Sequence, residues 1–206
     1  MTRAESPPRD TRADIFEAAA TSFSARGFDG VSVDDIAKQA RVNKAMIYYH
    51  FADKLALYRE VVAEMMQGVG AAVSAIADTK LAPNDKLNRF IETFLLLQLQ
   101  RPWFPTLMLR EIAEGAPHLD IATLGHLRGL IGAFGRILLE GQAAGVFRPI
   151  HPVLAYTSVV GPLIFNAARE RVAARHGPEF PMSVKIPPAE LLAHMQLVAR
   201  RMLERL

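Results

Sequence analysis

The segment from Lys38 to His50 gathers side chains that could bind a nucleic acid. It contains three cations, Lys38, Arg41 and Lys44, and no acidic residue. Lysine and arginine neutralise phosphates and donate hydrogen bonds to guanine, while hydroxyl and imidazole groups donate to phosphate oxygens. A small residue such as Ala45 lets a helix approach the bases and touch a thymine methyl group. These residue types favour DNA as the partner.

The spacing of the residues separates two faces of a short helix. At about 100° per residue, a helix that follows Asn43 turns Ile47 and Phe51 to one side, where they can pack on a preceding helix. Met46 and His50 fall at the edges between the faces. The opposite face is long, aromatic and cationic, and we expect it to meet DNA. It consists of Lys44, Ala45, Tyr48 and Tyr49.

Two caps predict where the helices of this segment begin. Ser32 caps the first of them, and Asp35 stands three residues later, as in a capping box with Asp in place of the usual Glu. Asn43 caps the second helix, which we expect to end near residues 51–52, and it is also a candidate DNA-binding residue. Arg41 lies in the short turn between them. Two helices joined by such a turn form the helix-turn-helix pattern, whose second helix enters the major groove.

Residues that flank the two helices are expected to lie along the DNA backbone. Val33 is in the first turn of the earlier helix, which crosses the backbone in this motif. Lys54 begins the next helix, whose free N–H groups also suit a phosphate. Asp34 is unfavourable beside a phosphate, so we expect its side chain to point away from DNA or to cap its helix.

The composition limits the class of protein. The 206 residues are enough for one or two domains, and half of them are hydrophobic, so a core can form. The absence of cysteine excludes a disulfide framework and any thiolate metal or redox site, which fits a reducing cytoplasm. The net charge of +3 permits DNA binding without arguing for it. Residues 1–54 carry eight basic and eight acidic side chains, so the informative charge is local.

The pattern of apolar residues predicts an all-α fold, because these residues recur at spacings of three and four and show no long alternation. We expect a disordered arm over residues 1–10 and a three-helix helix-turn-helix DNA-binding domain over residues 11–54. A helical ligand-binding and dimerisation domain is expected over residues 55–206. The first helix begins near Asp10 and ends at Gly27. Longer helices are predicted over residues 53–77, 87–100, 104–113, 118–144, 152–176 and 188–206.

Residues 149–168 form an uncharged stretch that is long enough to raise the question of a membrane helix. The stretch contains prolines and polar residues such as His151 and Asn166, which favour a buried helix at a packing interface. No secretory signal is visible, because the first ten residues are polar and lack an apolar region. We therefore expect a cytoplasmic protein without a membrane partner.

The middle helices of the larger part carry large apolar residues with a few polar residues among them. Small-molecule sites have this composition, so a mainly apolar effector is expected. The alternative is plain core packing for each aromatic residue and a solvated turn for Glu111. The candidate ligand-binding residues are Phe90, Phe94, Leu97, Gln98, Trp103, Met108, Glu111, Phe134, Phe165 and Asn166.

The last two long helices are expected to form a four-helix interface between two copies of the chain. Small residues and an apolar row in helical register support this expectation, and the alternative is that the row is buried within one subunit. A two-fold dimer presents two recognition helices about 34–36 Å apart to a palindrome. The candidate interface residues are Ala155, Gly161, Leu191, Met195, Val198 and Met202.

A dense set of residues in the first part of the chain forms a family signature. Its members are Ile15, Ala18, Ala19, Phe23, Gly27, Phe28, Val31, Ser32, Val33, Asp35, Ile36, Ala37, Val42, Asn43, Lys44, Ile47, Tyr48, His50, Phe51, Lys54 and Leu55. On this signature, residues 11–62 resemble the N-terminal domain of the TetR family of transcriptional regulators. Residues 63–206 match that family in architecture only. The resemblance implies that Met46, His50 and Lys54 face DNA together with the exposed face described above.

Arg41 departs from the family pattern, which usually has glycine in this turn. The turn commonly needs a positive φ, which costs a non-glycine residue roughly 1 kcal/mol. Two interpretations of Arg41 stay open. Its side chain is either solvated, with the strain tolerated, or it reaches a flanking phosphate.

Together these features predict a ligand-responsive transcriptional repressor. It would bind a palindromic double-stranded DNA operator as a homodimer and be released by a small, mainly apolar molecule. The alternative is a structural or constitutive DNA-binding protein with no small-molecule ligand. An enzyme is not expected, because the chain has no Ser/His/Asp grouping at a telling spacing, no glycine-rich phosphate loop and no HExxH motif. No metal or cofactor is expected, since the six histidines never stand three or four residues apart.

Overall fold

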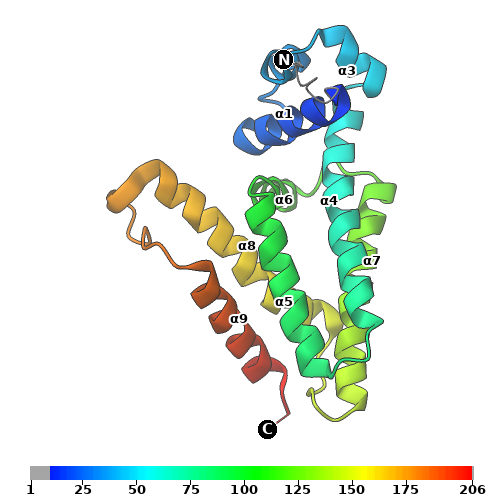
Figure 1. Ribbon diagram of the computed structural model, residues 1–206, viewed down its shortest axis with the longest axis vertical. Helices are drawn as coiled ribbons and strands as arrows, with labels where there is room; N and C mark the ends of the chain where they lie inside the picture. Colours follow the sequence, from blue (N-terminus) through cyan, green and yellow to red (C-terminus); the bar gives the residue numbers. More distant parts are fainter. Residues whose placement is uncertain (1–9, 206) are drawn as a thin grey trace, which may run out of the picture. The chain divides into compact units, whose positions relative to one another are not determined.

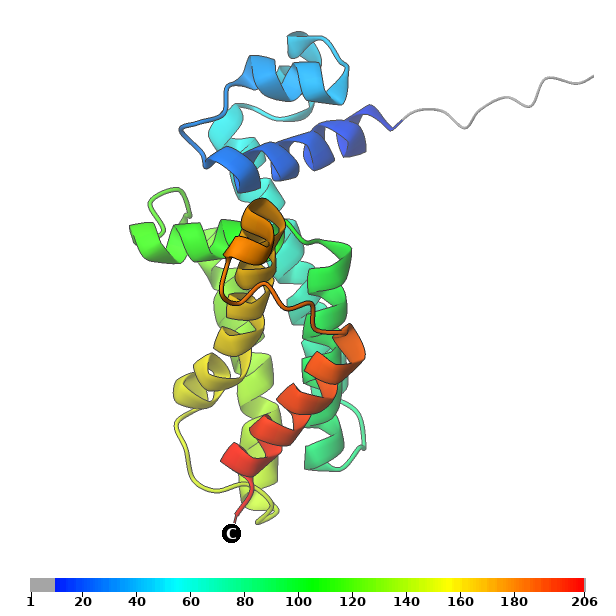
Figure 2. The same ribbon diagram turned by 90° about the vertical axis from the view of Figure 1, so that its left-hand side faces the viewer.

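The computed structural model describes residues 10–205, which fold into α-helices (Figure 1, Figure 2). Within these residues the only β-type pairing is an isolated antiparallel bridge between Phe147 and Glu204. The all-α prediction is therefore confirmed. The predicted arm lies outside the described residues except for Asp10. The elements are α1 (Thr11–Arg26), α2 (Val33–Ala40), α3 (Lys44–His50), α4 (Lys54–Ala77), α5 (Pro83–Gln100), α6 (Phe104–Glu114), α7 (Ile121–Ala143), α8 (Pro152–His176), the short 3-10 helix η1 (Gly177–Glu179) and α9 (Pro188–Leu203).

The chain divides into two compact units, one ending at Val61 and the other beginning at Val62. The division lies inside α4. The sequence places the end of the DNA-binding domain earlier in the chain, at Lys54. The domain boundary after Lys54 stays a prediction.

In the first unit, α1 packs on α2, and α3 contacts both of them. Ile15, Ile36 and Ile47, one from each helix, are completely buried. The rings of Phe23 and Tyr58 meet edge to face with their centroids 4.9 Å apart, which joins α1 to the beginning of α4. Three short helices that could not stand alone in water thus share one small apolar core.

The caps of the first two helices follow the sequence pattern. Asp10 accepts a hydrogen bond from the backbone N–H of Ala13 at 3.1 Å and so caps α1. Both bonds of the predicted capping box on α2 are present, between Ser32 and Asp35. The backbone N–H of Ser32, hydrogen-bonded to the carboxylate, lowers the pKa of Asp35. The capping carboxylate is therefore ionised at neutral pH, the form that accepts hydrogen bonds.

The second unit is built around aromatic side chains from three helices. The ring centroid of Phe90 on α5 lies 4.8 Å from that of Phe134 on α7 and 6.5 Å from that of Tyr156 on α8. Burial raises the pKa of Tyr156. Around this cluster, α5 packs on α7, α8 and α9, and α6 packs on α8. Figure 2 shows α9 lying beside α5.

Three helix ends differ from the sequence prediction for local reasons. The helix predicted from residue 87 begins at Pro83, because proline has no N–H to satisfy and its fixed φ suits the first helical position. The helix predicted from residue 118 begins after Asp120, whose carboxylate accepts from the N–H of Thr123 at 2.8 Å. The last helix ends at Leu203, since Glu204 is extended and pairs with Phe147.

Judged by length and composition alone, α4 is the one helix among the described residues that could cross a membrane. A core helix of a soluble protein passes the same test, and a third of the apolar stretch of α4 is buried. The uncharged stretch near the start of α8 does not pass it.

Two glycines of α7 differ sharply in the space around them. A Cβ atom at Gly141 would overlap the ring of Phe147, which is 2% exposed, whereas a Cβ atom at Gly132 would meet no atom within 4 Å. We expect Gly141→Ala to lower the free energy of unfolding by about 1–3 kcal/mol through overpacking. Gly132→Ala should raise it by about 0.5–1 kcal/mol through helix propensity.

Urea denaturation of the two variants beside the unmodified chain measures both effects. Because the two substitutions are chemically identical and lie on one helix, each is the control for the other. A Gly141→Ala variant as stable as Gly132→Ala would contradict the close packing of Phe147 on α7.

Candidate nucleic-acid interface

The turn between α2 and α3 depends on a left-handed residue. Arg41 has φ 55° and ψ 45°, so the positive φ expected at this position is present without glycine. Its backbone N–H donates to the carbonyl of Lys38 at 3.2 Å, and the N–H of Val42 donates to the carbonyl of Ala37 at 3.0 Å. These bonds close the end of α2 and redirect the chain into α3.

The beginning of α3 is fixed by Asn43, whose side-chain oxygen accepts from the N–H of Ala45 at 2.9 Å. Ile47 is completely buried and Phe51 is 3% exposed, so one side of the helix faces the core. On the other side Tyr48 is 49% exposed and Tyr49 is 79% exposed. Lys44 and Ala45 are also exposed. The face that the spacing predicts to meet DNA is thus the face in contact with solvent, and the DNA contact itself stays a prediction.

The two edge residues of α3 are half-buried, as their angular positions predict. Met46 follows the exposed Ala45 along the chain. The rings of His50 and Tyr49 meet edge to face, with centroids 5.0 Å apart. The Nε2 atom of His50 is buried without a hydrogen-bond partner among the described residues, so a phosphate contact would have to use Nδ1.

Lys44 is paired within the protein. Its ammonium nitrogen lies 2.8 Å from the carboxylate of Asp34, and both side chains are largely exposed. The hydrogen bond to Asp34 raises the pKa of Lys44. The cap of α2 is formed by Ser32 and Asp35, so Asp34 does not cap its helix, and its carboxylate pairs with a side chain of α3 instead. That Asp34 points away from DNA stays a prediction. The pair crosses the turn between two helices, so helical periodicity gives no signal for it. Val33, the neighbour of Asp34, is half-buried.

Lys54 has a structural role that the sequence did not reveal. Its ammonium donates to the carbonyl oxygens of Phe28 at 3.1 Å and Val31 at 3.0 Å, and it lies 4.0 Å from the centroid of the Phe28 ring. The first N–H groups of α4 are capped by Asp53, whose carboxylate accepts from Ala56 at 2.8 Å. Lys54 therefore ties the loop before α2 to α4, and a phosphate contact by its ammonium would require these bonds to break.

The candidate ligand-binding residues do not form one open site. Phe90, Phe94 and Phe134 fill the aromatic core. Phe165 is 58% exposed and so does not line an interior pocket, because it lies on the outer side of α8. Asn166 is half-buried and donates to the carbonyl of Pro162 of its own helix. The remaining buried candidates are Gln98, Trp103, Met108 and Glu111, and Leu97 is half-buried.

Two of these candidates are polar side chains that the protein encloses. Glu111 is 1% exposed and lies 2.8 Å from Nδ1 of His118, so it is not in a solvated turn. Gln98 is 7% exposed and lines a cavity between α5, α8 and α9.

The candidate interface residues separate into two groups. Ala155, Leu191 and Met195 are buried within the chain, so they belong to the contacts that α8 and α9 make with other helices of the same chain. Gly161 and Val198 are exposed, and Met202 is half-buried. Only the second group can meet a second copy of the chain without rearrangement.

Within residues 10–205, no group of three or more His, Cys, Asp or Glu side chains is arranged to hold a metal ion. What α3 offers is a short exposed helix face with a cation, a small residue and two hydroxyls. An α-helix fits the width of the major groove, and these groups match phosphate oxygens and base edges.

Comparison with known proteins agrees with this geometry. Residues 15–61 match the family model described as bacterial regulatory proteins, tetR family, and residues 83–176 match one described as tetracyclin repressor-like, C-terminal domain. The transcriptional regulator RutR of Escherichia coli strain K12 is 30% identical over 138 residues, which cover 67% of this chain and 65% of RutR. The transcriptional repressor NicS of Pseudomonas putida is 29% identical over 140 residues, 67% of this chain and 66% of NicS.

The chain thus spans slightly less than two thirds of the length of these curated relatives. Among solved structures, the TetR family transcriptional regulator PfmR of Thermus thermophilus superposes with a TM-score of 0.72 at 25% identity. The superposition covers 93% of this chain and 99% of PfmR, so it includes both units of the fold.

Replacement of Arg41 by glycine separates its backbone role from its side-chain role. We expect Arg41→Gly to raise the free energy of unfolding by about 1 kcal/mol, because glycine adopts the left-handed region without steric cost. If the guanidinium also neutralises a phosphate, the slope of log K against log salt falls by about one. Fluorescence anisotropy with duplex DNA over a salt series measures the slope.

Ala116 provides a matched control, since it is the other described non-glycine residue with positive φ, at 58°. Ala116→Gly should change stability in the same direction and leave DNA binding unaltered. An Arg41→Gly variant with an unchanged salt slope would rule out the phosphate contact.

The Asp34–Lys44 pair predicts that Asp34 restrains DNA binding. Asp34→Asn removes a negative charge from the side of the molecule that carries α3 and frees the Lys44 ammonium. We expect affinity for a random duplex to rise several-fold near 0.1 M salt, with a steeper salt slope by about one. Asp85→Asn, the same change at an exposed position in the first turn of α5, should have no such effect. Equal behaviour of the two variants would show that the pair does not limit the availability of Lys44.

Proposed function

The chain belongs to the TetR family of bacterial regulatory proteins, and we propose that it is a repressor that binds a palindromic DNA operator as a homodimer. A small molecule bound in the second unit releases it from the operator. The DNA-bound role implies a cytoplasmic protein. The observation that carries the proposal is the exposed face of α3, with Lys44, Tyr48 and Tyr49 outward and Ile47 fully buried.

Repression rather than activation is supported by the similarity to NicS, which is described as a transcriptional repressor. A repressor needs only to occupy its operator. The exposed side chains of α3 provide hydrogen-bond donors and a cation for contacts with DNA. Occupation of the operator is therefore the simplest mode of action.

The homodimer is supported by an apolar row on the outer side of α8. Leu154, Gly161, Phe165 and Val172 recur at spacings of seven and four residues and are all exposed. On α9, Leu197 and Val198 are 47% and 41% exposed. Apolar side chains in helical register on two adjacent helices suit burial against the same surface of a second copy. This row replaces Ala155, Leu191 and Met195 in the proposed interface.

The release step is a shift between two populations of the dimer. An effector that binds one spacing of the two α3 helices more tightly than another shifts the dimer toward that spacing. Typical coupling free energies are about 1–3 kcal/mol. We propose α4 as the connecting element, because it runs without interruption through the division between the two units. Its glycines, Gly68 and Gly70, lower its helix propensity on the far side of that division.

The alternative function is a constitutive DNA-binding regulator with no effector. Both functions require the α3 face, so DNA binding alone does not separate them. The difference lies in whether any small molecule changes the affinity for the operator.

Selection of bound sequences from random duplex DNA tests the proposal and identifies the operator in the same experiment. We expect a two-fold symmetric sequence whose half-sites are centred about one helical turn apart. Lys44→Gln should weaken binding to the selected duplex roughly ten-fold and lower the salt slope by about one. Lys80→Gln, the same charge change at an exposed position between α4 and α5, serves as the control. Failure to enrich any sequence, or equal losses in both variants, would contradict the proposed function.

A further inference from the structure

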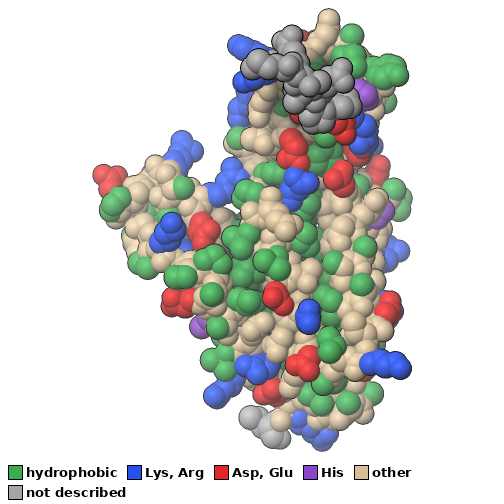
Figure 3. Space-filling model, in the orientation of Figure 1, with side chains coloured by type: hydrophobic (Ala, Val, Ile, Leu, Met, Phe, Trp, Pro, Cys, Tyr) green, Lys and Arg blue, Asp and Glu red, His purple; other side chains and the backbone are tan. Residues whose placement is uncertain are grey.

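A cavity of about 220 Å³ lies between the C-terminal end of α5, the second half of α8 and the beginning of α9. In Figure 3, hydrophobic side chains gather on the surface where α8 and α9 meet α5. The cavity is within the second unit. Its walls are mainly apolar, with Leu95, Leu99, Pro102, Pro188 and Leu191 among them.

One buried amide on the wall lacks a partner. Gln98 is 7% exposed and lines the cavity, and its Nε2 atom has no hydrogen-bond acceptor among the described residues. A buried N–H group is rarely left unsatisfied, because its loss of water is not compensated. An acceptor supplied by a ligand would satisfy it.

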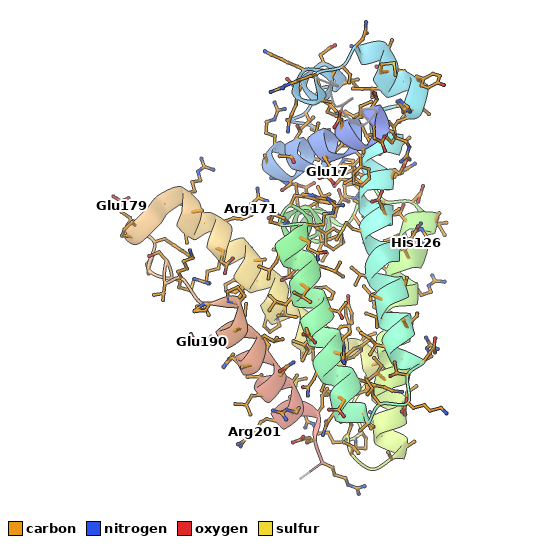
Figure 4. The ribbon with its side chains drawn as sticks, viewed as in Figure 1. Glu17, His126, Arg171, Glu179, Glu190 and Arg201 are labelled. Atoms are coloured by element: carbon orange, nitrogen blue, oxygen red, sulfur yellow. The ribbon has the colours of Figure 1, made fainter. Side chains whose placement is uncertain are left out.

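The mouth of the cavity carries charges that are already paired. Arg171 on α8, labelled in Figure 4, donates to the hydroxyl of Thr106 on α6 at 3.1 Å. Glu170 lies 3.8 Å from the guanidinium of Arg169. Since one residue of each sign lines the cavity and each has a partner in the chain, the site offers no net charge to a ligand.

A second buried side chain fixes the segment that leads from α8 to α9. Arg169, 8% exposed, donates from Nη1 to the carbonyl oxygens of Met182 at 2.6 Å and Val184 at 2.8 Å. These bonds tie the segment that connects α8 to α9 back onto α8. This segment leads into α9, which contributes Pro188 and Leu191 to the wall of the cavity.

We propose that this cavity is the effector site and that its ligand is a compact, neutral, mainly apolar molecule with one hydrogen-bond acceptor, such as a carbonyl oxygen, for the Gln98 amide. The cavity is smaller than the roughly 300–1,000 Å³ of sites for drug-sized ligands, which favours a small aromatic or alicyclic compound. That the ligand regulates DNA binding rests on the proposed function, whereas the binding of such a ligand in the cavity does not.

Two probes of similar size, one with a hydrogen-bond acceptor and one without, test the chemistry. Acetophenone carries an aromatic ring and one carbonyl, and isopropylbenzene replaces the carbonyl oxygen by a methyl group. Chemical-shift titration of the full-length protein by NMR gives the Kd of each probe. In Gln98→Leu, which keeps the size of the side chain, acetophenone affinity should fall about five-fold or more, the factor expected for one net hydrogen bond. Isopropylbenzene affinity should stay the same or rise.

A second variant tests the location. Ala174 is exposed on α8 and lines the cavity, so Ala174→Phe fills the space without disturbing the core. It should abolish the binding of both probes. Ala122→Phe, at an exposed position near the start of α7 and away from the cavity, should bind them as the unmodified chain does.

The outcomes are distinct for the site and for the proposed function, because probe binding is measured without DNA. Equal loss of both probes in Gln98→Leu, or unchanged binding in Ala174→Phe, would overturn the proposed site. If the protein binds acetophenone as described but selects no DNA sequence from random duplexes, the cavity is a binding site and the proposed repressor function is wrong.

Discussion

The burial of Ile47, on a helix that packs on α1 and α2, is the constraint on which the rest of the DNA-facing surface depends. A helix of seven residues such as α3 is unstable alone, so its orientation comes from the side that it buries. Because Ile47 is completely buried and Asn43 fixes the start of the helix, Lys44, Tyr48 and Tyr49 can only point outward. The left-handed Arg41 holds this arrangement at the turn, and Lys54 holds it from the far end of α3.

The first unit was predictable to the level of side-chain faces because its signals are local. Caps at Asp10, Ser32 and Asn43, and the period of α3, each act within a few residues of the chain. What local signals could not predict are the bonds that join residues far apart in sequence. Lys54 reaches carbonyl groups more than twenty positions earlier, and Lys44 reaches across the turn to Asp34. A lysine in a basic segment suggests a contact with a DNA phosphate. Its ammonium can equally donate to a carbonyl or carboxylate oxygen of the protein itself.

In the second unit the helices were predictable and their contacts were not. Apolar periodicity locates α8 and α9 but does not say which apolar side meets the same chain and which remains outside. Leu191 and Val198 belong to one sequence pattern, but the first is 9% exposed and the second 41%. Phe165 looked like a pocket residue and lies on the surface. Lys86, 2% exposed and 2.6 Å from Glu140, is a buried charge that no amphipathic pattern anticipates. The sequence pattern of a helix does not predict these contacts, because it does not indicate which other helix packs against it.

The helix α8 separates the proposed cavity from the proposed dimer surface, and this links the two. Val159 and Leu163 are buried in the core of the second unit, and Ala167 and Ala174 continue the same side of the helix and line the cavity. Phe165 and Val172 lie on the opposite side, where they are exposed in the apolar row. A ligand that fills the cavity would therefore press on α8 from the side opposite the surface that a second copy would cover. Packed helices shift as rigid bodies rather than deform continuously. An effector in this cavity would thus act on the geometry between the two subunits, and so on the spacing of the two α3 helices.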